Sequence, residues 1–376
     1  MVMFAGVSSE ASLQPIKSTV VATGLGFPSA FAIANDGTVY ATSLAGYFLL
    51  RVANGTATPI YHFTSPAFSS YQGAGPGGIA LDPNFDSNRH LYTFSNGEND
   101  TASGKISCSV YRFTINAQGQ AVDQRQILRI RANPCAFEAG GKMAFGPDGK
   151  LYIGVGTMMA DYGPDPSLSQ PQFQAKAQNW NSQVGKILRI NRDGSFPRDN
   201  PKPKGIWAKG VRNAFGFAWD MNSPKPQNMW ESEPGPDCND EINLVTKSVN
   251  LGWGSKFSCT KGTAPKNTNQ NGDHIKFPKA MLQPAATAGA RPPTPTGLQL
   301  CDVNCPLAGY SNRLLVATFQ PGTVVTWNIA GGKKRNVLND QRMSYMHGPP
   351  ITAMEKHING SIYIADATGM LSRLTI

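Results

Sequence analysis

The chain lacks any run of about 18 consecutive apolar residues, so no segment is predicted to span a membrane. Charged residues are scarce at 15% of the sequence, whereas 40% of the residues are hydrophobic and can build a large core. The first residues, Met1-Val2-Met3, lack the basic and apolar regions of a secretory signal peptide. That lack excludes nothing, because a chain cut after its signal would look the same.

Concentrated positive charge is also missing, although the net charge is +10. The 34 Lys and Arg residues are spread thinly, and the one tight basic run, Lys333-Lys334-Arg335, is typical of a solvated turn. No nucleic-acid-binding motif is present, so we expect neither a nucleic acid nor a membrane as a partner. The charge favours an anionic small molecule or an acidic surface, and the sequence indicates no oligomeric state.

No cysteine spacing is typical of a zinc site. The six cysteines form three pairs of near neighbours, Cys108–Cys135, Cys238–Cys259 and Cys301–Cys305. Three glycosylation sequons begin at Asn54, Asn99 and Asn359. Together they predict disulfides and a secreted glycoprotein, or one in the secretory pathway; the alternative is reduced cysteines and chance sequons.

Turn residues are abundant, with 39 Gly and 28 Pro, and long helices are not indicated. A unit of strand, turn and strand recurs six times, at residues 30–42, 78–93, 141–153, 216–231, 297–317 and 351–364. Apolar and polar residues alternate about the turn of each unit, which is the pattern of half-buried antiparallel strands.

The repeats predict an all-β fold, a six-bladed β-propeller with about four antiparallel strands in each blade. We expect one domain over residues 1–376, with 1–16 as a peripheral N-terminal segment and insertions at 160–180 and 255–290 as loops on one face. The strand at 18–22 is expected to lie beside the last blade and to close the ring. A pair of β-sandwiches would leave the sixfold recurrence unexplained.

Three motifs stand out between residues 75 and 254. They lie at 185–201, at 210–219, and at 233–243 running on to 250–254. These motifs resemble signatures of the soluble quinoprotein sugar dehydrogenases, the glucose and sorbosone dehydrogenase family. The run at 137–149 resembles a further signature of that family, which reads His-x-Gly-Gly-Arg-Leu and then a Gly-Pro-Asp-Gly turn.

The resemblance implies a cofactor site. Arg212 and Asn213 match residues that contact pyrroloquinoline quinone, and the carbonyls of Gly235 and Pro236 match ligands of a calcium ion. Carbonyl oxygens suit such a hard cation, and carboxylates follow in the same motif. In the alternative interpretation, Arg212 and Glu241 only brace adjacent blades through buried hydrogen bonds.

The chain departs from the family at the residues that carry its chemistry. Glu138 stands where the family has the His that takes the substrate hydroxyl proton. The Asp and Gln of the proton relay fall at Thr157 and Gly73, and a Lys that contacts the quinone falls at Gln320. An Arg pair before the last blade falls near Pro349-Pro350.

These losses argue against tight quinone binding. Pyrroloquinoline quinone carries three carboxylates, and each hydrogen bond between charged partners contributes roughly 1.5–3 kcal/mol. Three lost cations would cost about 5–9 kcal/mol, or about four to six decades of affinity. Binding would then need a replacement from Lys142, Lys209 or His347. We therefore expect no required cofactor, with calcium as an option at Gly235-Pro236.

The residues favour a former dehydrogenase whose axial pocket performs non-redox acid–base chemistry on a small molecule, as a lyase or cyclase. Dehydration, cyclisation and hetero-Diels–Alder coupling are the candidate reactions, and secreted fungal propellers of that last kind suit the description, although no motif ties the chain to them. Glu138 is the candidate base, and His347, with Tyr345 nearby, is the candidate acid in loops facing the pocket. Alternatively, Glu138 pairs with Lys142 or Arg212, and His347 is an ordinary loop residue.

Three other functions stay open. One is a working quinone- and calcium-dependent aldose dehydrogenase with Glu138 as its base. Another is a propeller that binds a carbohydrate or protein without catalysis. The last is a calcium-dependent lactonase, for which only Glu138 and Asn213 present themselves as axial ligands.

Overall fold

The structure is a computed structural model of the chain. It describes residues 13–70, 73–100, 105–130, 135, 137–158, 175–223, 225, 228–235, 240–254, 275–276, 278–282, 293–302, 304–330 and 335–376. The strands form six four-stranded antiparallel sheets.

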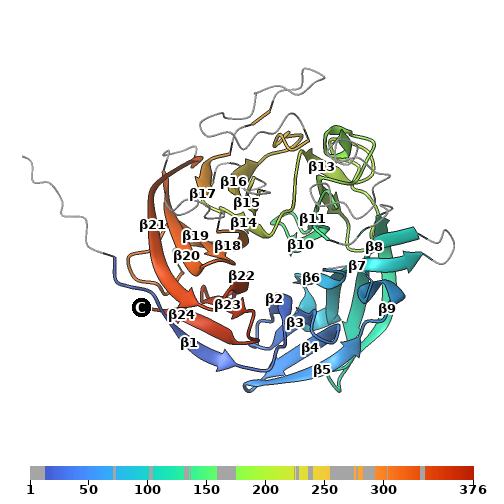
Figure 1. Cartoon of the computed structure of the whole chain (residues 1–376), viewed down its shortest axis with the longest axis horizontal. Coiled ribbons are helices and arrows are strands. Elements are labelled where there is room, and N and C mark those ends of the chain that lie inside the picture. The colour runs from blue at the N-terminus through green and yellow to red at the C-terminus, as the bar shows by residue number, and fades with distance from the viewer. Residues whose placement is uncertain are drawn as a thin grey trace, which may run out of the picture.

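These sheets stand around a central axis as the blades of a propeller (Figure 1). Blade one contains β2 (Pro28–Ile33), β3 (Val39–Ser43), β4 (Phe48–Ala53) and β5 (Thr56–His62). Blade two contains β6 (Gly75–Leu81), β7 (His90–Asp100), β8 (Lys105–Ile115) and β9 (Ala121–Ile130). Blade three contains β10 (Gly140–Phe145), β11 (Leu151–Val155), β12 (Lys186–Ile190) and β13 (Ile206–Lys209). Blade four contains β14 (Gly216–Trp219), β15 (Met229–Glu233), β16 (Asp240–Val245) and β17 (Ala280–Leu282). Blade five contains β18 (Pro295–Cys301), β19 (Arg313–Thr318), β20 (Gly322–Ala330) and β21 (Val337–Gly348). Blade six contains β22 (Ile351–Lys356), β23 (Ile362–Asp366), β24 (Leu371–Thr375) and β1 (Lys17–Ala22). The short helices η1 (Pro66–Phe68) and α1 (Phe85–Asn88) lie in connections.

Each of the six repeats seen in the sequence forms the first two strands of a blade, so the predicted fold is confirmed. The turn between β2 and β3 shows how the local sequence sets the strand ends. Gly37 takes the left-handed conformation at φ +86°, and the Asp36 carboxylate accepts a hydrogen bond from the Thr38 N–H at 2.8 Å. An Asp-Gly pair therefore reverses the chain at little conformational cost.

The inner strands explain why several repeats begin with glycine. A side chain on Gly78 of β6 would place its Cβ 1.7 Å from the carbonyl oxygen of Gly141 on β10. Likewise, a Cβ on Gly297 of β18 would meet the backbone nitrogen of Met354 on β22 at 2.6 Å. The inner strands of neighbouring blades approach too closely at the axis for any larger residue.

Strand β1 closes the ring by pairing antiparallel with β24, with Ser18 opposite Leu374. Figure 1 shows β1 along the outer side of β24, so the two ends of the chain share blade six. The predicted closing strand at 18–22 is thus confirmed. The peripheral segment 1–16 and the single domain stay predictions, because residues 1–12 lie outside the described part of the chain.

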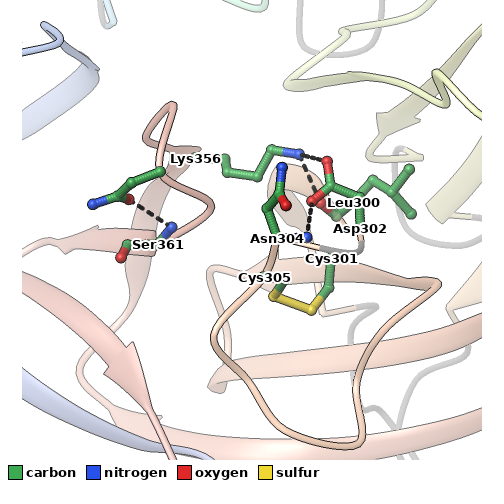
Figure 2. Close-up of a disulfide and its surroundings, with 8 residues drawn as sticks. Leu300, Cys301, Asp302, Asn304, Cys305, Lys356 and Ser361 are labelled. Atoms are coloured by element: carbon green, nitrogen blue, oxygen red, sulfur yellow. Dashed lines mark hydrogen bonds and ion pairs between the residues drawn. A yellow bond between two sulfur atoms is a disulfide. The ribbon is translucent and has the colours of Figure 1, made fainter.

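Two of the predicted disulfides, Cys108–Cys135 and Cys301–Cys305, are confirmed. Figure 2 shows the second of them beside Lys356 of β22, whose Nζ donates to the Asp302 carboxylate at 2.7 Å. This contact joins blades five and six. The pair Cys238–Cys259 lies outside the described residues.

Three other sequence predictions concern membrane-spanning segments, the two insertions and the basic run. In the described part of the chain, no helix is long and apolar enough to cross a membrane. The predicted insertions at 160–180 and 255–290 lie largely outside the described residues. Arg335, at the end of the basic run, pairs with the buried carboxylate of Asp220, and Lys333 and Lys334 lie outside the described residues.

Candidate active site

Four of the sequence-predicted site residues, Glu138, Arg212, Asn213 and Gly235, lie at the end of the propeller where inner strands begin. Glu138 precedes β10 of blade three, and Arg212 and Asn213 lie between β13 and β14, the inner strand of blade four. Gly235 follows β15 in the same blade. Glu138 has φ +53°, a conformation that non-glycine residues rarely adopt and that is common at functional sites.

Glu138 and Arg212 form a buried ion pair in which Arg212 Nη2 donates to Glu138 Oε1. Their side chains are 7% and 4% exposed, respectively. Arg212 Nη1 also donates to the Pro234 carbonyl at 2.9 Å, and its guanidinium carbon lies 5.5 Å from the centre of the Trp253 ring. The sequence left open whether Glu138 pairs with Lys142 or Arg212, and the structure pairs it with Arg212.

Glu233 binds the backbone of the loop that carries Arg212. Its Oε2 accepts hydrogen bonds from the backbone N–H groups of Arg212 at 2.6 Å and Asn213 at 3.0 Å. Burial raises the pKa of Glu233 to about 7, although these N–H groups and the Arg212 charge oppose the rise. The sequence showed Glu233 only as the first residue of a motif, because nothing local says which N–H groups it meets.

The Gly235 turn is held by a second buried carboxylate. Asp240 accepts from the Gly235 N–H at 2.9 Å and from the Thr294 N–H at 2.7 Å, and burial raises its pKa to about 6. Pro236, the other predicted calcium ligand, lies outside the described residues. In the described chain, no three His, Cys, Asp or Glu side chains form a metal-binding group.

The positions of the lost proton relay have structural roles. Thr157 is fully buried, and its N–H and Oγ1 both donate to the Arg212 carbonyl, at 2.9 and 3.3 Å. The Gly73 carbonyl accepts from Asn96 Nδ2 at 2.7 Å. Gln320, expected where the family has a Lys, is exposed. None of these three residues has a titratable side chain.

His347 and Tyr345 lie on β21, the last strand of blade five, rather than in a loop. His347 Nε2 bonds the Asp366 carboxylate at 2.8 Å, and its Nδ1 bonds the Tyr345 hydroxyl at 3.0 Å. The same hydroxyl donates to Ser18 Oγ of β1 at 2.7 Å. This group sits between blades five and six, with no described contact to Glu138, so the proposed acid role of His347 stays a prediction.

The other cations considered for the quinone also have partners. Lys142 of β10 pairs with Glu355 of β22. Lys209 Nζ donates to the Gln178 carbonyl at 3.1 Å and lies 4.7 Å from the centre of the Trp180 ring. With His347 bound to Asp366, each replacement named from the sequence is already engaged.

Two surface hollows found in the described chain lie away from this site. One, of about 420 Å³, is lined by aromatic residues that include Tyr47 and Phe68. The other, of about 510 Å³, lies at the turns around Asp148 and Asn191. Neither of these two hollows includes Glu138 or Arg212 in its lining.

The chain is thus a six-bladed propeller with a buried carboxylate–guanidinium pair at the end where its inner strands begin. Comparison with known proteins identifies its family: residues 25–373 match the Glucose / Sorbosone dehydrogenase model, and the chain belongs to that family. The resemblance drawn from the motifs is thereby confirmed.

Relatives and solved structures agree with this assignment. Quinoprotein glucose dehydrogenase B of Acinetobacter calcoaceticus is 24% identical over 359 residues, 87% of this chain and 74% of the relative. Aldose sugar dehydrogenase YliI of Escherichia coli is 30% identical over 183 residues, 46% of this chain and 44% of the relative. The PQQ-bound aldose sugar dehydrogenase of Streptomyces coelicolor has a TM-score of 0.72 at 22% identity, covering 96% and 97% of the two chains, which shows the shared fold.

The residues fit the two parts of the family's cofactor site unequally. The Asn213 Oδ1 atom is buried without a hydrogen-bond partner among the described residues, and a calcium ion or a ligand donor beside Gly235 would satisfy it. A quinone carboxylate would compete with Glu138 for the Arg212 guanidinium. The described residues thus leave one buried acceptor, Asn213 Oδ1, for a cation or donor, whereas a quinone would compete with Glu138 for Arg212.

Proposed function

We propose that the chain acts on a small sugar-like molecule, that Glu138 is the base that removes a hydroxyl proton, and that the reaction is a dehydrogenation of the aldose type. The observation that carries the proposal is the buried Glu138–Arg212 pair, at the position where the family resemblance places the catalytic His. Family membership along nearly the whole chain supports dehydrogenation. This order of preference reverses the one drawn from the sequence, in which lost cations favoured non-redox chemistry.

The chain's own residues account for the proton transfer. The Glu138 carboxylate accepts the hydroxyl proton, and the Arg212 guanidinium then keeps its charge and stabilises negative charge on the substrate oxygen. Glu233 holds the Arg212 backbone in place through two N–H groups. When bound, pyrroloquinoline quinone would accept the hydride from the carbon that carries the substrate hydroxyl. Arg212 and Asn213 would contact the quinone, and the Gly235 carbonyl would be a calcium ligand.

Reconstitution tests this proposal. Purified protein incubated with pyrroloquinoline quinone and calcium should reduce a dye when an aldose is added, and Glu138→Gln should lower that rate about 10²–10⁴-fold. The quinone absorbance of the same variant should show binding at least as tight as in the native chain, because Arg212 is released. Glu355→Gln, which alters a half-buried Glu in another ion pair, is the control and should keep the rate.

The proposed acid role of His347 has its own variant. His347→Gln should leave dye reduction within about three-fold, because the described partners of His347 are Tyr345 and Asp366 and no contact joins it to Glu138. A loss as large as that of Glu138→Gln would restore His347 to the site.

A non-redox transformation is the second candidate function. It is favoured because each cation that we considered for quinone binding already has a partner in the structure. Arg212, Lys142 and His347 all pair with carboxylates, so the described site offers no free cation of that set to a tricarboxylate. The expected activity is dehydration or cyclisation of a hydroxylated small molecule without added cofactor, as a lyase or cyclase. Product formation without dye reduction would select this candidate; ligand binding unchanged by Glu138→Gln, without turnover, would indicate a binding module.

We also propose passage through the secretory pathway. The described disulfides support it, and the sequon residues Asn54 and Asn359 lie in exposed turns. The side chain of Asn99 lies outside the described part. Glycosidase-sensitive mass on protein expressed in a eukaryotic secretory host would support glycosylation, and its absence at both turns would contradict it.

A further inference from the structure

The aromatic hollow lies on the same face of the propeller as Glu138. It is lined by residues 47, 62–66 and 68, and we call it the blade-one hollow. These residues belong to the turn between β3 and β4, the end of β5 and the connection that leads to β6. Glu138 lies in the matching connection that leads to β10. Strands within each blade are antiparallel, so such turns and connections gather at one end of the ring (Figure 1).

The connection that leads to β6 borders both the hollow and the neighbour of Glu138. A Cβ on Gly75, at the start of β6, would meet Tyr47 Cδ1 of the hollow at 3.0 Å. Two residues earlier, a Cβ on Gly73 would lie 3.4 Å from Phe137 Cδ2, and Phe137 directly precedes Glu138. A long ligand that lies along this connection would therefore extend from the hollow toward Glu138.

The aromatic walls of the hollow are fixed by contacts within the protein. The Tyr47 hydroxyl donates to the Phe68 carbonyl at 3.1 Å, and the centres of the two rings are 4.8 Å apart. The His62 ring lies 5.0 Å from that of Phe48, which is opposite it on β4. Tyr47 has φ +56°, a strained conformation for a bulky residue and one that clusters at binding and catalytic sites. The walls are thus set before any ligand arrives, which lowers the entropic cost of binding.

The lining determines which kind of ligand fits. Its volume of about 420 Å³ is in the range of small-molecule sites, and its lining includes no Asp, Glu, Lys or Arg to pair with a charged ligand. Tyr47 and Phe68 contribute apolar ring atoms, whereas His62 and Thr64 are exposed and can bond a hydroxyl. A wholly apolar ligand would take water from these polar groups without replacing it. An uncharged ring with apolar faces and hydroxyl groups at its edge satisfies both parts, and a pyranose has this form.

We propose that the blade-one hollow binds one sugar unit of a neutral oligosaccharide whose end unit lies at Glu138. The position of the end unit rests on the proposed function, whereas binding in the hollow does not. The sugar ring packs on Tyr47, and His62 and Thr64 bond its hydroxyls. The preferred substrate is therefore a chain of several sugar units rather than a free monosaccharide.

Oligosaccharide binding to the full chain, measured without quinone or calcium, tests the hollow. Maltohexaose and cellohexaose are the probes, and calorimetry should show that one of them binds more tightly than glucose. Tyr47→Ala should weaken that binding roughly ten-fold, because the main apolar wall is lost. Tyr363→Ala is the matched control, since Tyr363 is also half-buried but lies on β23 of blade six, and it should retain the affinity.

A second variant keeps the test decisive if Tyr47→Ala fails to fold. His62 is exposed, so His62→Ala should leave stability nearly unchanged and still weaken hexaose binding measurably. The proposal is overturned if neither hexaose binds, or if both variants bind the hexaose as tightly as the native chain. Binding of indole that is lost in Tyr47→Ala, with no binding of either hexaose, would assign the hollow to an apolar ligand instead.

Turnover separates this inference from the proposed function. In protein reconstituted with quinone and calcium, Tyr47→Ala should lower kcat/KM for the bound hexaose roughly ten-fold more than kcat/KM for glucose. An equal effect on the two substrates would remove the hollow from the path of the substrate and overturn the proposal. Hexaose binding that depends on Tyr47, with no sugar oxidised, would support the hollow and contradict only the dehydrogenase function.

Discussion

The seam between blades three and four and the seam between blades five and six carry similar polar residues but use them differently. At the first, Glu138 pairs with the Arg212 guanidinium, which also donates to the backbone carbonyl of Pro234 after β15. At the second, His347 is held on both ring nitrogens, by Asp366 and by Tyr345. At one seam a carboxylate is thus paired with a guanidinium, whereas at the other the imidazole is held in bonds that tie β21 to blade six. A residue type capable of catalysis does not by itself make a site.

The largest expected effect on stability is at the first seam. Arg212→Met leaves the Glu138 carboxylate buried without its cation, and we expect a loss of about 3–5 kcal/mol in the free energy of unfolding. Urea denaturation measures it. Arg342→Met is the control, because Arg342 is 39% exposed and pairs with Asp340 at 2.7 Å, so that change should cost less than about 1 kcal/mol. Equal losses would remove the distinction between a buried pair and a surface pair.

The pH dependence of stability should have opposite signs at the two seams. Glu233 has its pKa raised from 4.5 to about 7 by burial, so the folded state binds the proton more tightly and stability falls as the pH rises through that range. Although burial opposes it, hydrogen bonds from Thr368 and His347 hold the pKa of Asp366 below its usual value of 3.8. Its contribution is present above about pH 3.8 and is lost as the pH falls further.

Urea denaturation at a series of pH values, with a metal chelator present, separates the contributions of Glu233 and Asp366 to the free energy of unfolding. Glu233→Gln should remove on the order of 3 kcal/mol of the decline between pH 4.5 and about 7. Asp366→Asn should alter only the acid limb. A native protein whose stability rises through neutral pH would contradict the raised pKa of Glu233.

The smallest effect concerns the closure of the ring. Tyr345→Phe removes the hydroxyl that donates to Ser18 Oγ and bonds His347, and it should cost about 1 kcal/mol in the free energy of unfolding. Ser18→Ala should cost less, and the double variant should be less destabilised than the sum of the two. Strict additivity would show that the hydroxyl does not couple β1 to β21.

The fold was predictable because its signals are local and repeated. Alternating strands and Asp-Gly turns are short-range features, and six copies of one weak pattern indicate a propeller where a single copy would not. Glycines such as Gly78 carried a further signal, since only the axis demands so close an approach of backbones. Glu138, Arg212 and Gly235 could be placed together from their motifs.

Other parts of the site could not be predicted from the sequence. From the sequence Glu233 was only the first residue of a motif, yet its role depends on N–H groups about 20 residues earlier in the chain. Asp366 precedes an ordinary turn, and its contact with His347 follows from the packing of two blades. The position of His347 in a strand also differs from the predicted loop, because the outer strand of blade five extends to Gly348.

The sequence by itself determined the strand pattern, the six repeats, the closing strand and the substitution of Glu138 for the family's His, because each is written in contiguous residues. Only the tertiary structure decided which cation that carboxylate meets, which acids stand behind it and which imidazole is already bound. Those outcomes depend on contacts between side chains of different blades in the buried interior. There a single contact can decide whether a side chain is charged. The spacing of residues along the sequence does not encode such contacts.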